Sequence, residues 1–306
     1  MLTKDQPLIS VVIPTYNHAE FLRIALESVI RQKYSSWEVI VIDNHSNDHT
    51  DEIVESFNDS KIRLLKIHNN GVIGASRNYG IHQAKGEWIS FMDSDDLWYP
   101  TKLATCVEFC KDHKDKFDVI STDEIMVFTD SDKKRVLNHG PSSKNMYRDM
   151  LLYGNRLSPS ATMVRSSFLK EHSVTFSESK DFVTAEDYDF WLQLAWFDAK
   201  FLFIEKIEGE YLIHGANASG HLNKQISANM HVVKKHVFEL QDFESDRGKL
   251  WGKMKARIYF SDAIKRFQVG GFIKMIKPLS LSLASSPAGF IDFVYKKLML
   301  RMKKAK

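Results

Sequence analysis

Cysteine is scarce in this sequence of 306 residues, which contains only Cys106 and Cys110, four positions apart on a predicted helix. Two cysteines do not make the disulfide framework of a small secreted protein. A redox or metal site would need further ligands at a suitable spacing, and the adjacent sequence offers none. We therefore expect both residues to be reduced thiols, as in most cytosolic proteins.

Long hydrophobic runs are also missing. The two longest stretches without a charged residue, 6–19 and 278–291, hold 14 residues each. A membrane-spanning helix needs about 20 apolar residues. Residues 1–7 lead straight into a strand-like segment and show no secretory signal pattern. We predict a cytoplasmic protein without a transmembrane helix.

The formal net charge of +3 hides an uneven distribution. Residues 1–220 hold 24 basic and 33 acidic residues, a net charge of −9, whereas residues 221–306 hold 18 and 6, a net charge of +12. With 43% hydrophobic and 26% charged residues, the composition is that of a folded globular protein. We predict a catalytic domain over 1–220 and a basic, mainly helical extension over 221–306.

Strand and helix patterns alternate through the first 100 residues. Strands are expected at 9–13, 37–42, 62–67 and 88–92, and helices at 18–32, 48–57, 74–84 and 99–110. This alternation is typical of parallel strands joined by right-handed helical crossovers, and thus of an α/β fold. Further strands are expected at 117–122, 124–129, 161–165, 201–204 and 209–213, and helices at 144–153 and 188–197.

Polar or acidic residues follow each of the four predicted parallel strands. The four endings are Pro14-Thr15-Tyr16-Asn17, Asp43-Asn44-His45-Ser46, the loop 69–74 leading to Arg77, and Asp93-Ser94-Asp95-Asp96. Ligands of an open parallel sheet bind beyond the carboxyl ends of its strands. Turns are polar in any protein, but four such endings at one sheet edge predict a binding site.

The segment Asp93-Ser94-Asp95-Asp96 has the most specific chemistry. Three carboxylates directly after an apolar strand repel one another unless a positive charge lies among them. Aspartates two positions apart can bind one Mg²⁺ or Mn²⁺, whose remaining ligands come from phosphates and water. Trp98 stands where an EF-hand requires glycine, so that class is excluded. An acidic cap on the following helix is the alternative.

Three further segments are candidates for binding or catalysis. Arg77 follows a glycine-containing loop and could bind a diphosphate through two hydrogen bonds. Glu186 and Asp187 begin an aromatic-rich helix, where a carboxylate stays ionised and could accept a proton from a bound hydroxyl. His214 follows a strand and could contact a metal or phosphate. A surface arginine, an acidic N-cap and a structural histidine remain the respective alternatives.

In this order the segments resemble glycosyltransferase family 2, whose members have the GT-A fold and invert the anomeric centre. The resemblance covers roughly residues 8–220, through the segments 11–17, 41–48, 74–80, 91–96, 186–192 and 211–214. It implies a Rossmann-like fold with a mostly parallel mixed sheet flanked by helices. The sequence contains no dinucleotide-binding, P-loop, nucleophile-elbow or zinc-protease motif that would favour another class.

The resemblance also implies a role for each matching residue. The residues that would bind the nucleotide sugar are Pro14, Thr15, Tyr16, Asn17, Asp43, Arg77, Asp93, Ser94 and Glu186. Asp95 and His214 would bind a divalent cation, Mn²⁺ or Mg²⁺, with Asp96 open as a further ligand, and Asp187 would be the catalytic base. The family's second strand usually ends in two acids and a Gly-Ser turn, whereas here Asn44 and His45 follow Asp43, which leaves the donor less defined.

The implied activity is transfer of a hexosyl or N-acetylhexosaminyl group from a nucleotide-diphosphate sugar, UDP by family habit, to a glycan or lipid-linked acceptor. Such enzymes make bacterial surface polysaccharide and lipopolysaccharide. Two other functions stay open. A nucleotidyltransferase normally needs a glycine-rich, lysine-containing first loop, which this chain lacks. A non-catalytic nucleotide-sugar-binding protein would not need Asp95, Asp187 and His214 together.

The pattern of apolar and basic residues over 288–304 predicts a basic amphipathic helix. Its apolar face holds Ile291, Val294, Tyr295, Leu298 and Met302, and its lysines Lys296, Lys297, Lys303 and Lys304 lie off that face. Such a helix can lie on an anionic membrane, and packing on the protein or a partner is the alternative. Nucleic acid is not an expected partner, because the rest of the chain is acidic. We expect peripheral contact with the inner face of the cytoplasmic membrane.

Overall fold

The structure is a computed structural model of the chain, and it describes residues 6–111, 116–214 and 222–304. The chain forms two compact units. The first comprises residues 1–147, 156–180 and 189–217, and the second comprises 148–155, 181–188 and 218–306. The expected boundary near residue 220 stays a prediction.

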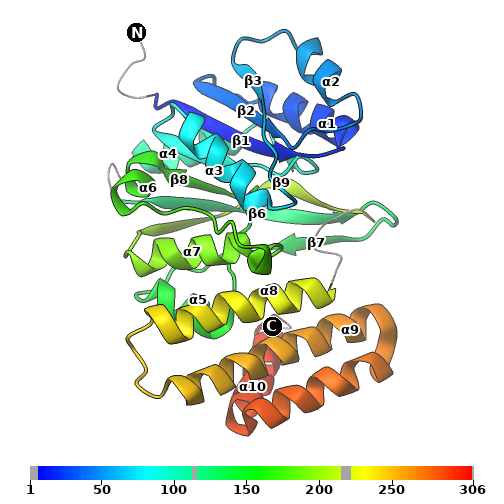
Figure 1. Cartoon of the computed structure of the whole chain (residues 1–306), viewed down its shortest axis with the longest axis vertical. Helices are drawn as coiled ribbons and strands as arrows, with labels where there is room; N and C mark the ends of the chain where they lie inside the picture. The colour runs from blue at the N-terminus through cyan, green and yellow to red at the C-terminus, as the bar shows by residue number, and fades with distance from the viewer. Residues whose placement is uncertain (1–5, 112–115, 215–221, 305–306) are drawn as a thin grey trace. The chain divides into compact units, whose positions relative to one another are not determined.

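The described part of the first unit is built on one nine-stranded mixed sheet (Figure 1). Its strands are β1 (Ile9–Thr15), β2 (Trp37–Asp43), β3 (Ile62–Lys66), β4 (Trp88–Phe91), β5 (Leu97–Trp98), β6 (Val119–Phe128), β7 (Lys134–Leu137), β8 (Thr162–Arg165) and β9 (Phe201–Ile213). The order is β3-β2-β1-β4-β8-β6-β9-β5, and β7 pairs with β6. The four strands β1 to β4 are parallel, as predicted. Strand β8 runs antiparallel to both β4 and β6.

Helices flank this sheet, which confirms the predicted fold class. In the first unit these are α1 (Ala19–Ile30), α2 (Thr50–Ser56), α3 (Ile73–Gln83), α4 (Lys102–Lys111), α6 (Ser166–His172) and most of α7 (Glu186–Trp196). Helix α5 (Met146–Tyr153) and a 3₁₀ turn at Lys180–Phe182 belong mainly to the second unit. Every residue of β1 and β2 is buried, because both faces of a parallel sheet are covered. Helix α1 contributes Leu22, Leu26 and Val29 to the same core. This core therefore holds in place the strands whose carboxyl ends carry the polar loops.

Several predicted boundaries are wrong. Strand β1 was expected to end before Pro14 but continues to Thr15. Pro14 lies beyond the last pair between β1 and β4, so its missing amide hydrogen costs no bond to β4. The expected strands 117–122 and 124–129 are one strand, β6, whose register with β9 shifts on either side of Asp123. The break in the apolar pattern there marks a bulge and not a strand end.

The remaining differences concern short or interrupted elements. The expected strands 201–204 and 209–213 are one strand, β9, and the charged residues between them lie within it. Strands β5 and β7 and helix α6 were not expected, because two to seven residues carry too little periodicity to be identified.

The second unit is mainly helical, as predicted for residues after 221. Its elements include α8 (Leu222–Lys235), a π-helical turn at His236–Leu240, α9 (Arg247–Ser285) and α10 (Pro287–Lys304). Helix α9 is interrupted at Gly271, whose φ of 74° and ψ of −170° are not helical. Its second half folds back on its first, so that the Ser282 hydroxyl donates to the Ala256 carbonyl at 2.6 Å. We call α9 the helical hairpin, and its orange ribbon reverses direction in Figure 1.

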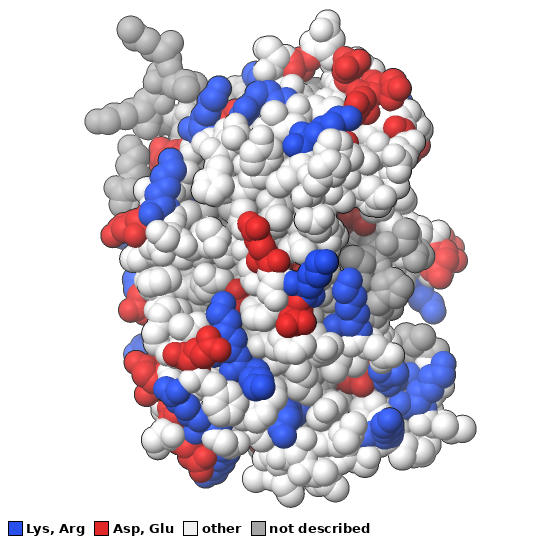
Figure 2. Space-filling model, viewed as in Figure 1, with Lys and Arg blue, Asp and Glu red and all other residues white. Residues whose placement is uncertain are grey.

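Helix α10 packs on the helical hairpin through part of its surface. The rings of Phe290 and Phe260 lie 5.8 Å apart, and Phe293 is buried. On the predicted apolar face, Ile291 and Tyr295 are exposed to solvent. The side chains of that face from residue 296 onward, Leu298 and Met302 among them, lie outside the described residues, as do the four lysines. Among the residues described, none of the helices combines the length and the apolar character that crossing a bilayer requires. Figure 2 shows basic side chains gathered at the lower right, where Figure 1 places the turn of the helical hairpin.

Candidate functional site

Hydrogen bonds join the loop after β1 to the loop after β2. The Asn17 amide donates to the Ser46 hydroxyl at 2.8 Å, and the Asn47 amide donates to the Asn17 side chain at 2.7 Å. Asn17 has a φ of 52°, a left-handed conformation that asparagine tolerates better than most residues. Pro14 and Thr15 are buried in β1, whereas Tyr16 is half exposed at the surface of the loop. The first predicted binding loop is therefore held in place and presents a tyrosine ring.

Asp43 is fully buried at the end of β2. Its carboxylate accepts hydrogen bonds from the Ser46 amide at 3.0 Å and the Ser46 hydroxyl at 2.5 Å. Lys66 Nζ lies 3.8 Å from the same carboxylate. The residues that differ from the family pattern form the turn between, where His45 has a φ of 55° and stacks on His68 at a ring distance of 3.8 Å. The turn thus keeps its serine contact to Asp43 without the usual glycine.

The buried Arg77 forms an ion pair with the half-buried Asp93. An Arg77 Nη donates to Asp93 Oδ1 at 2.7 Å, and the guanidinium carbon lies 5.3 Å from the centre of the Phe176 ring. The Asp93 amide donates to the Ser160 hydroxyl at 3.0 Å. A buried arginine needs such a partner, because an uncompensated charge in the interior is strongly unfavourable. The structure brings these two predicted residues together, so Arg77 fixes the position of Asp93.

Asp95 and His214 also meet, although 119 positions separate them in the sequence. His214 Nε2 lies 2.9 Å from Asp95 Oδ2. The His214 ring stacks on Phe21 at 4.5 Å. The adjacent Ser94 hydroxyl lies 3.2 Å from His18 Nδ1. The predicted metal ligands therefore stand side by side, and α1 supports the imidazole.

Asp95 and His214 contact each other directly, and the same spacing would suit two ligands of one divalent cation. Two neighbouring ligands about 2.1 Å from an octahedral ion are roughly 3 Å apart, which matches the separation of 2.9 Å. Across 6–111, 116–214 and 222–304, the structure shows no cluster of three or more acidic, histidine or cysteine side chains that could hold a metal. A cation on these two residues would complete its coordination with substrate phosphates and water, as Mg²⁺ commonly does.

The Asp96 carboxylate points into the protein interior. It is buried, its Oδ1 accepts from the Leu212 amide at 3.1 Å, and its Oδ2 accepts from the Ser160 hydroxyl. Burial, followed by the nearby charges of Asp95 and Asp93, raises the pKa of Asp96 well above its ordinary value. These contacts tie the acidic loop to β9 and to the segment before β8. They favour a positioning role for Asp96 over the open alternative of metal ligation.

In the second unit, Asp187 and Glu186 lie at the start of α7. The Asn155 side-chain amide donates to Asp187 Oδ2 at 3.1 Å. Glu186 is buried and accepts from the Thr184 amide at 2.8 Å. The Tyr188 hydroxyl donates to the Met150 carbonyl at 2.7 Å. Glu186 therefore holds the turn that leads into its helix, whereas Asp187 accepts a hydrogen bond from a side chain of α5's C-terminal flank.

Sequence reasoning missed several residues that support the site. Ser160 links Asp93 to Asp96, His18 and Phe21 surround His214, and Asn155 contacts Asp187. His18 directly follows the first polar loop, and that position is a usable signal. Ser160 and Asn155 carry no local signal, because only the fold brings them to their partners.

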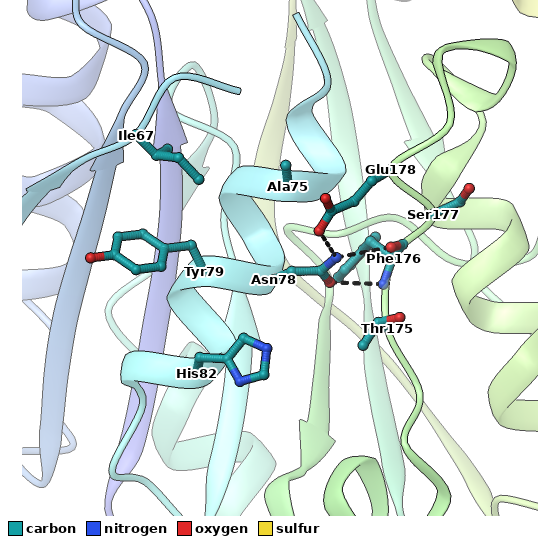
Figure 3. Close-up of a pocket in the computed structure, with 9 residues that line it drawn as sticks. All are labelled: Ile67, Ala75, Asn78, Tyr79, His82, Thr175, Phe176, Ser177 and Glu178. Atoms are coloured by element: carbon teal, nitrogen blue, oxygen red, sulfur yellow. Dashed lines mark hydrogen bonds between the residues drawn. The ribbon is translucent and has the colours of Figure 1, made fainter. Parts of the chain in front are cut away.

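A separate pocket of about 440 Å³ opens on α3 (Figure 3). It is lined by Ile67, Ala75, Asn78, Tyr79, His82, Thr175, Phe176, Ser177 and Glu178. The Asn78 side chain bonds both the carbonyl and the amide of Phe176 at 2.9 Å. None of the predicted site residues lines this pocket. Asn78 instead holds the aromatic ring on which the Arg77 guanidinium rests.

Comparison with known proteins adds independent information. Residues 10–172 match the family model described as Glycosyl transferase family 2. The chain is 28% identical over 229 residues to the Escherichia coli protein named UDP-Glc:alpha-D-GlcNAc-diphosphoundecaprenol beta-1,3-glucosyltransferase WfaP, covering 74% of this chain and 86% of that protein.

Two solved structures share the fold. One is S. aureus TarS 1-349 in complex with UDP-GlcNAc, with a TM-score of 0.64, 20% identity, and coverage of 90% of this chain and 79% of that chain. The other is the mannosyltransferase PcManGT from Pyrobaculum calidifontis in complex with GDP-Man and Mn²⁺, with a TM-score of 0.62, 14% identity, and coverage of 97% and 81%.

Proposed function

Because the chain belongs to glycosyl transferase family 2, we propose that it transfers a hexosyl or N-acetylhexosaminyl group from a UDP-sugar to a hydroxyl of a lipid-linked acceptor, with inversion. The observation that carries the proposal is the pairing of Asp95 with His214, close in sequence to Asp93 and its ion pair with Arg77. WfaP, whose name gives UDP-Glc as donor and a diphosphoundecaprenol as acceptor, supports this choice of substrates.

The donor would lie across the loops at the carboxyl edge of β1, β2 and β4. Tyr16 and Asn17 would contact the nucleoside, and the buried Asp43 would hold the adjacent turn in place through Ser46. Asp93, held by Arg77, would contact the ribose. Thr15 and Pro14 would support this loop from β1, and Ser94 would keep the acidic loop in place through His18. Glu186 would contribute to donor binding indirectly, because it holds the start of α7 in place.

Asp95 and His214 would hold a divalent cation, Mn²⁺ or Mg²⁺, which supplies positive charge to the diphosphate leaving group. Asp187 would remove the proton from the acceptor hydroxyl as its oxygen bonds to the anomeric carbon. The bond between that carbon and the diphosphate oxygen breaks at the opposite face, and UDP leaves with the electron pair. One displacement without a covalent intermediate inverts the configuration.

Release of UDP from UDP-glucose and UDP-GlcNAc, measured with and without EDTA, tests this activity. We expect turnover that EDTA abolishes and Mn²⁺ restores, and that rises when a polyprenyl-diphosphate sugar is added. Release of pyrophosphate from a nucleoside triphosphate would instead identify a nucleotidyltransferase. Donor binding without turnover under all conditions would identify a non-catalytic binding protein.

We also propose that residues 1–220 form the catalytic domain and that residues 221–306 contact the cytoplasmic membrane, where such an acceptor resides. The net charge of +12 in the extension and the exposed Ile291 and Tyr295 support this division. Anionic lipids attract basic surfaces, and exposed apolar side chains can enter the lipid interface.

A further inference from the structure

The turn of the helical hairpin exposes an apolar surface. Gly271, with its φ of 74°, provides the reversal that most other residues adopt only with strain. Around it, Phe267 is 52% exposed, Phe272 67%, Ile273 83% and Ile276 50%. Side chains of this size are usually buried in a soluble domain. We call these four residues the hairpin tip.

Three of the exposed apolar residues beyond the turn share one face of the second half of α9, whereas Ile273 and Leu281 lie off that face. Phe272, Ile276 and Leu283 recur at helical spacing, and Leu283 is 46% exposed. The buried residues Pro278 and Ser282 lie on another face, where Ser282 bonds the first half of the hairpin. The apolar face is therefore not the packing face of the hairpin, and it extends from the turn along the helix.

The charge around the hairpin tip has one sign. From residue 263 to residue 291 the chain has no acidic residue and four basic ones, Lys265, Arg266, Lys274 and Lys277. Lys274 and Lys277 are exposed, and helical spacing puts them on the flank of the helix beyond Ile273, away from Phe272 and Ile276. The basic side chains at the lower right of Figure 2 coincide with the position of this turn in Figure 1. Arg266 pairs with Asp262 at 2.8 Å, so the positive charge that the hairpin tip offers to a partner comes mainly from Lys274 and Lys277.

We infer that the hairpin tip docks on an anionic phospholipid bilayer. Phe272, Ile273 and Ile276 would enter the interface between head groups and acyl chains, while Lys274 and Lys277 would contact lipid phosphates. The inference deepens the proposed action on a lipid-linked acceptor and rests on it. A second copy of the chain is a less suitable partner for the hairpin tip, because two such surfaces in contact would bring like charges together.

Co-sedimentation of the full chain with vesicles tests the docking surface without any sugar transfer. Vesicles of phosphatidylcholine alone are compared with vesicles that also contain phosphatidylglycerol. We expect the wild type to bind the mixed vesicles. The F272S/I273S variant should bind them roughly tenfold or more weakly, because two inserting side chains become polar. The K274Q/K277Q variant should also bind these vesicles about tenfold more weakly, and its residual binding should depend less on salt.

Ile24→Ser is the matched control, because Ile24 is an exposed aliphatic residue of α1 in the other unit. It should bind vesicles as the wild type does. If F272S/I273S fails to fold, as judged by its circular dichroism and thermal melt, K274Q/K277Q decides the question.

Two results would overturn the docking surface. One is unchanged vesicle binding in folded variants of both kinds. The other is a concentration-dependent dimer of the wild type that F272S/I273S disperses, which would make the tip a contact between copies. UDP-sugar turnover by the wild type is measured in parallel. Vesicle binding without turnover would count against the proposed function alone.

Discussion

At the scale of single residues, the site depends on side chains whose positions other side chains determine. Asp95 is placed beside His214, Asp93 is held by Arg77, and both lie next to Asp96, which bonds β9. The chemistry proposed for Asp95 and Asp187 can be tested separately, because one would act on the donor and the other on the acceptor.

Asp187→Asn should leave donor binding intact and lower turnover by about 10²–10⁴-fold, the usual contribution of a general base. The amide cannot accept the acceptor's proton, but it keeps the size and can still bond Asn155. Single-turnover kinetics at saturating donor, together with donor titration calorimetry, measure both quantities. Turnover near that of the wild type would remove Asp187 from its proposed role.

Asp95→Ala and His214→Ala should each weaken Mn²⁺-dependent donor binding by roughly tenfold or more, because each removes one of two protein ligands of the proposed cation. Calorimetric titration of UDP, with and without Mn²⁺, measures the effect. Asp130→Ala, a change at an exposed acid, is the control and should bind as the wild type does. If Mn²⁺ strengthened UDP binding equally in the wild type and in all three variants, the metal assignment would be contradicted.

At the scale of elements, one carboxylate serves the beginnings of two helices. Asp48 Oδ2 accepts from the amide of Ala19, the first residue of α1, at 2.9 Å. Its Oδ1 accepts from the amide and hydroxyl of Thr50, the first residue of α2, at 3.2 and 2.5 Å. These helices support the loops after β1 and β2. Burial alone would raise the pKa of Asp48, but the hydrogen bonds from Thr50 and Ala19 outweigh it and lower the pKa below its ordinary value.

Asp48→Asn should lower the free energy of unfolding at pH 7 by about 1 kcal/mol, the usual cost of a weakened helix cap. Because the folded pKa is the lower one, the carboxylate stabilises the fold fully above about pH 4. That stabilisation is lost as the pH falls through the folded pKa. The variant should therefore differ from the wild type less at pH 2 than at pH 7 in urea unfolding. An equal difference at both pH values, or one shared by the exposed control Asp130→Asn, would contradict this account.

The turn of the helical hairpin offers a second test at this scale. Gly271→Ala should cost about 1 kcal/mol, because alanine is strained at a φ of 74° although no atom lies within 4 Å of the added methyl group. Gly248→Ala, in the first turn of the same helix, should be neutral or stabilising, since helices favour alanine. Urea unfolding followed by circular dichroism compares them. A loss in Gly248→Ala as large as that in Gly271→Ala would show that the conformation at 271 is not the cause.

At the scale of the whole molecule, the sequence predicts secondary structure best for elements that are buried on both faces. The apolar, β-branched residues of β1 and β2 identify them as buried parallel strands. Where one strand shifts register, as β6 does around Asp123, the pattern breaks and one strand is mistaken for two. The same interruption hides the length of β9.

The candidate site, too, could be predicted from the sequence only in part. The polar strand endings are visible in the sequence, and the resemblance to a family adds Asp187 and His214. The contact between Asp95 and His214 cannot be derived from local pattern, because β9 must first be placed beside β6. Asn155 and Ser160 were missed for the same reason, since their partners lie far away in the chain.

The position of β9 has a consequence for the order in which activity arises during synthesis. His214 follows the last strand of the sheet, and that strand lies inside it, between β6 and β5. Contacts between residues so distant in sequence form late, after the intervening chain has been ordered. A nascent chain that has not yet placed β9 would have Asp95 without its histidine. The proposed cation site is therefore assembled only when the last strand is inserted, and an incomplete chain would not consume the nucleotide sugar.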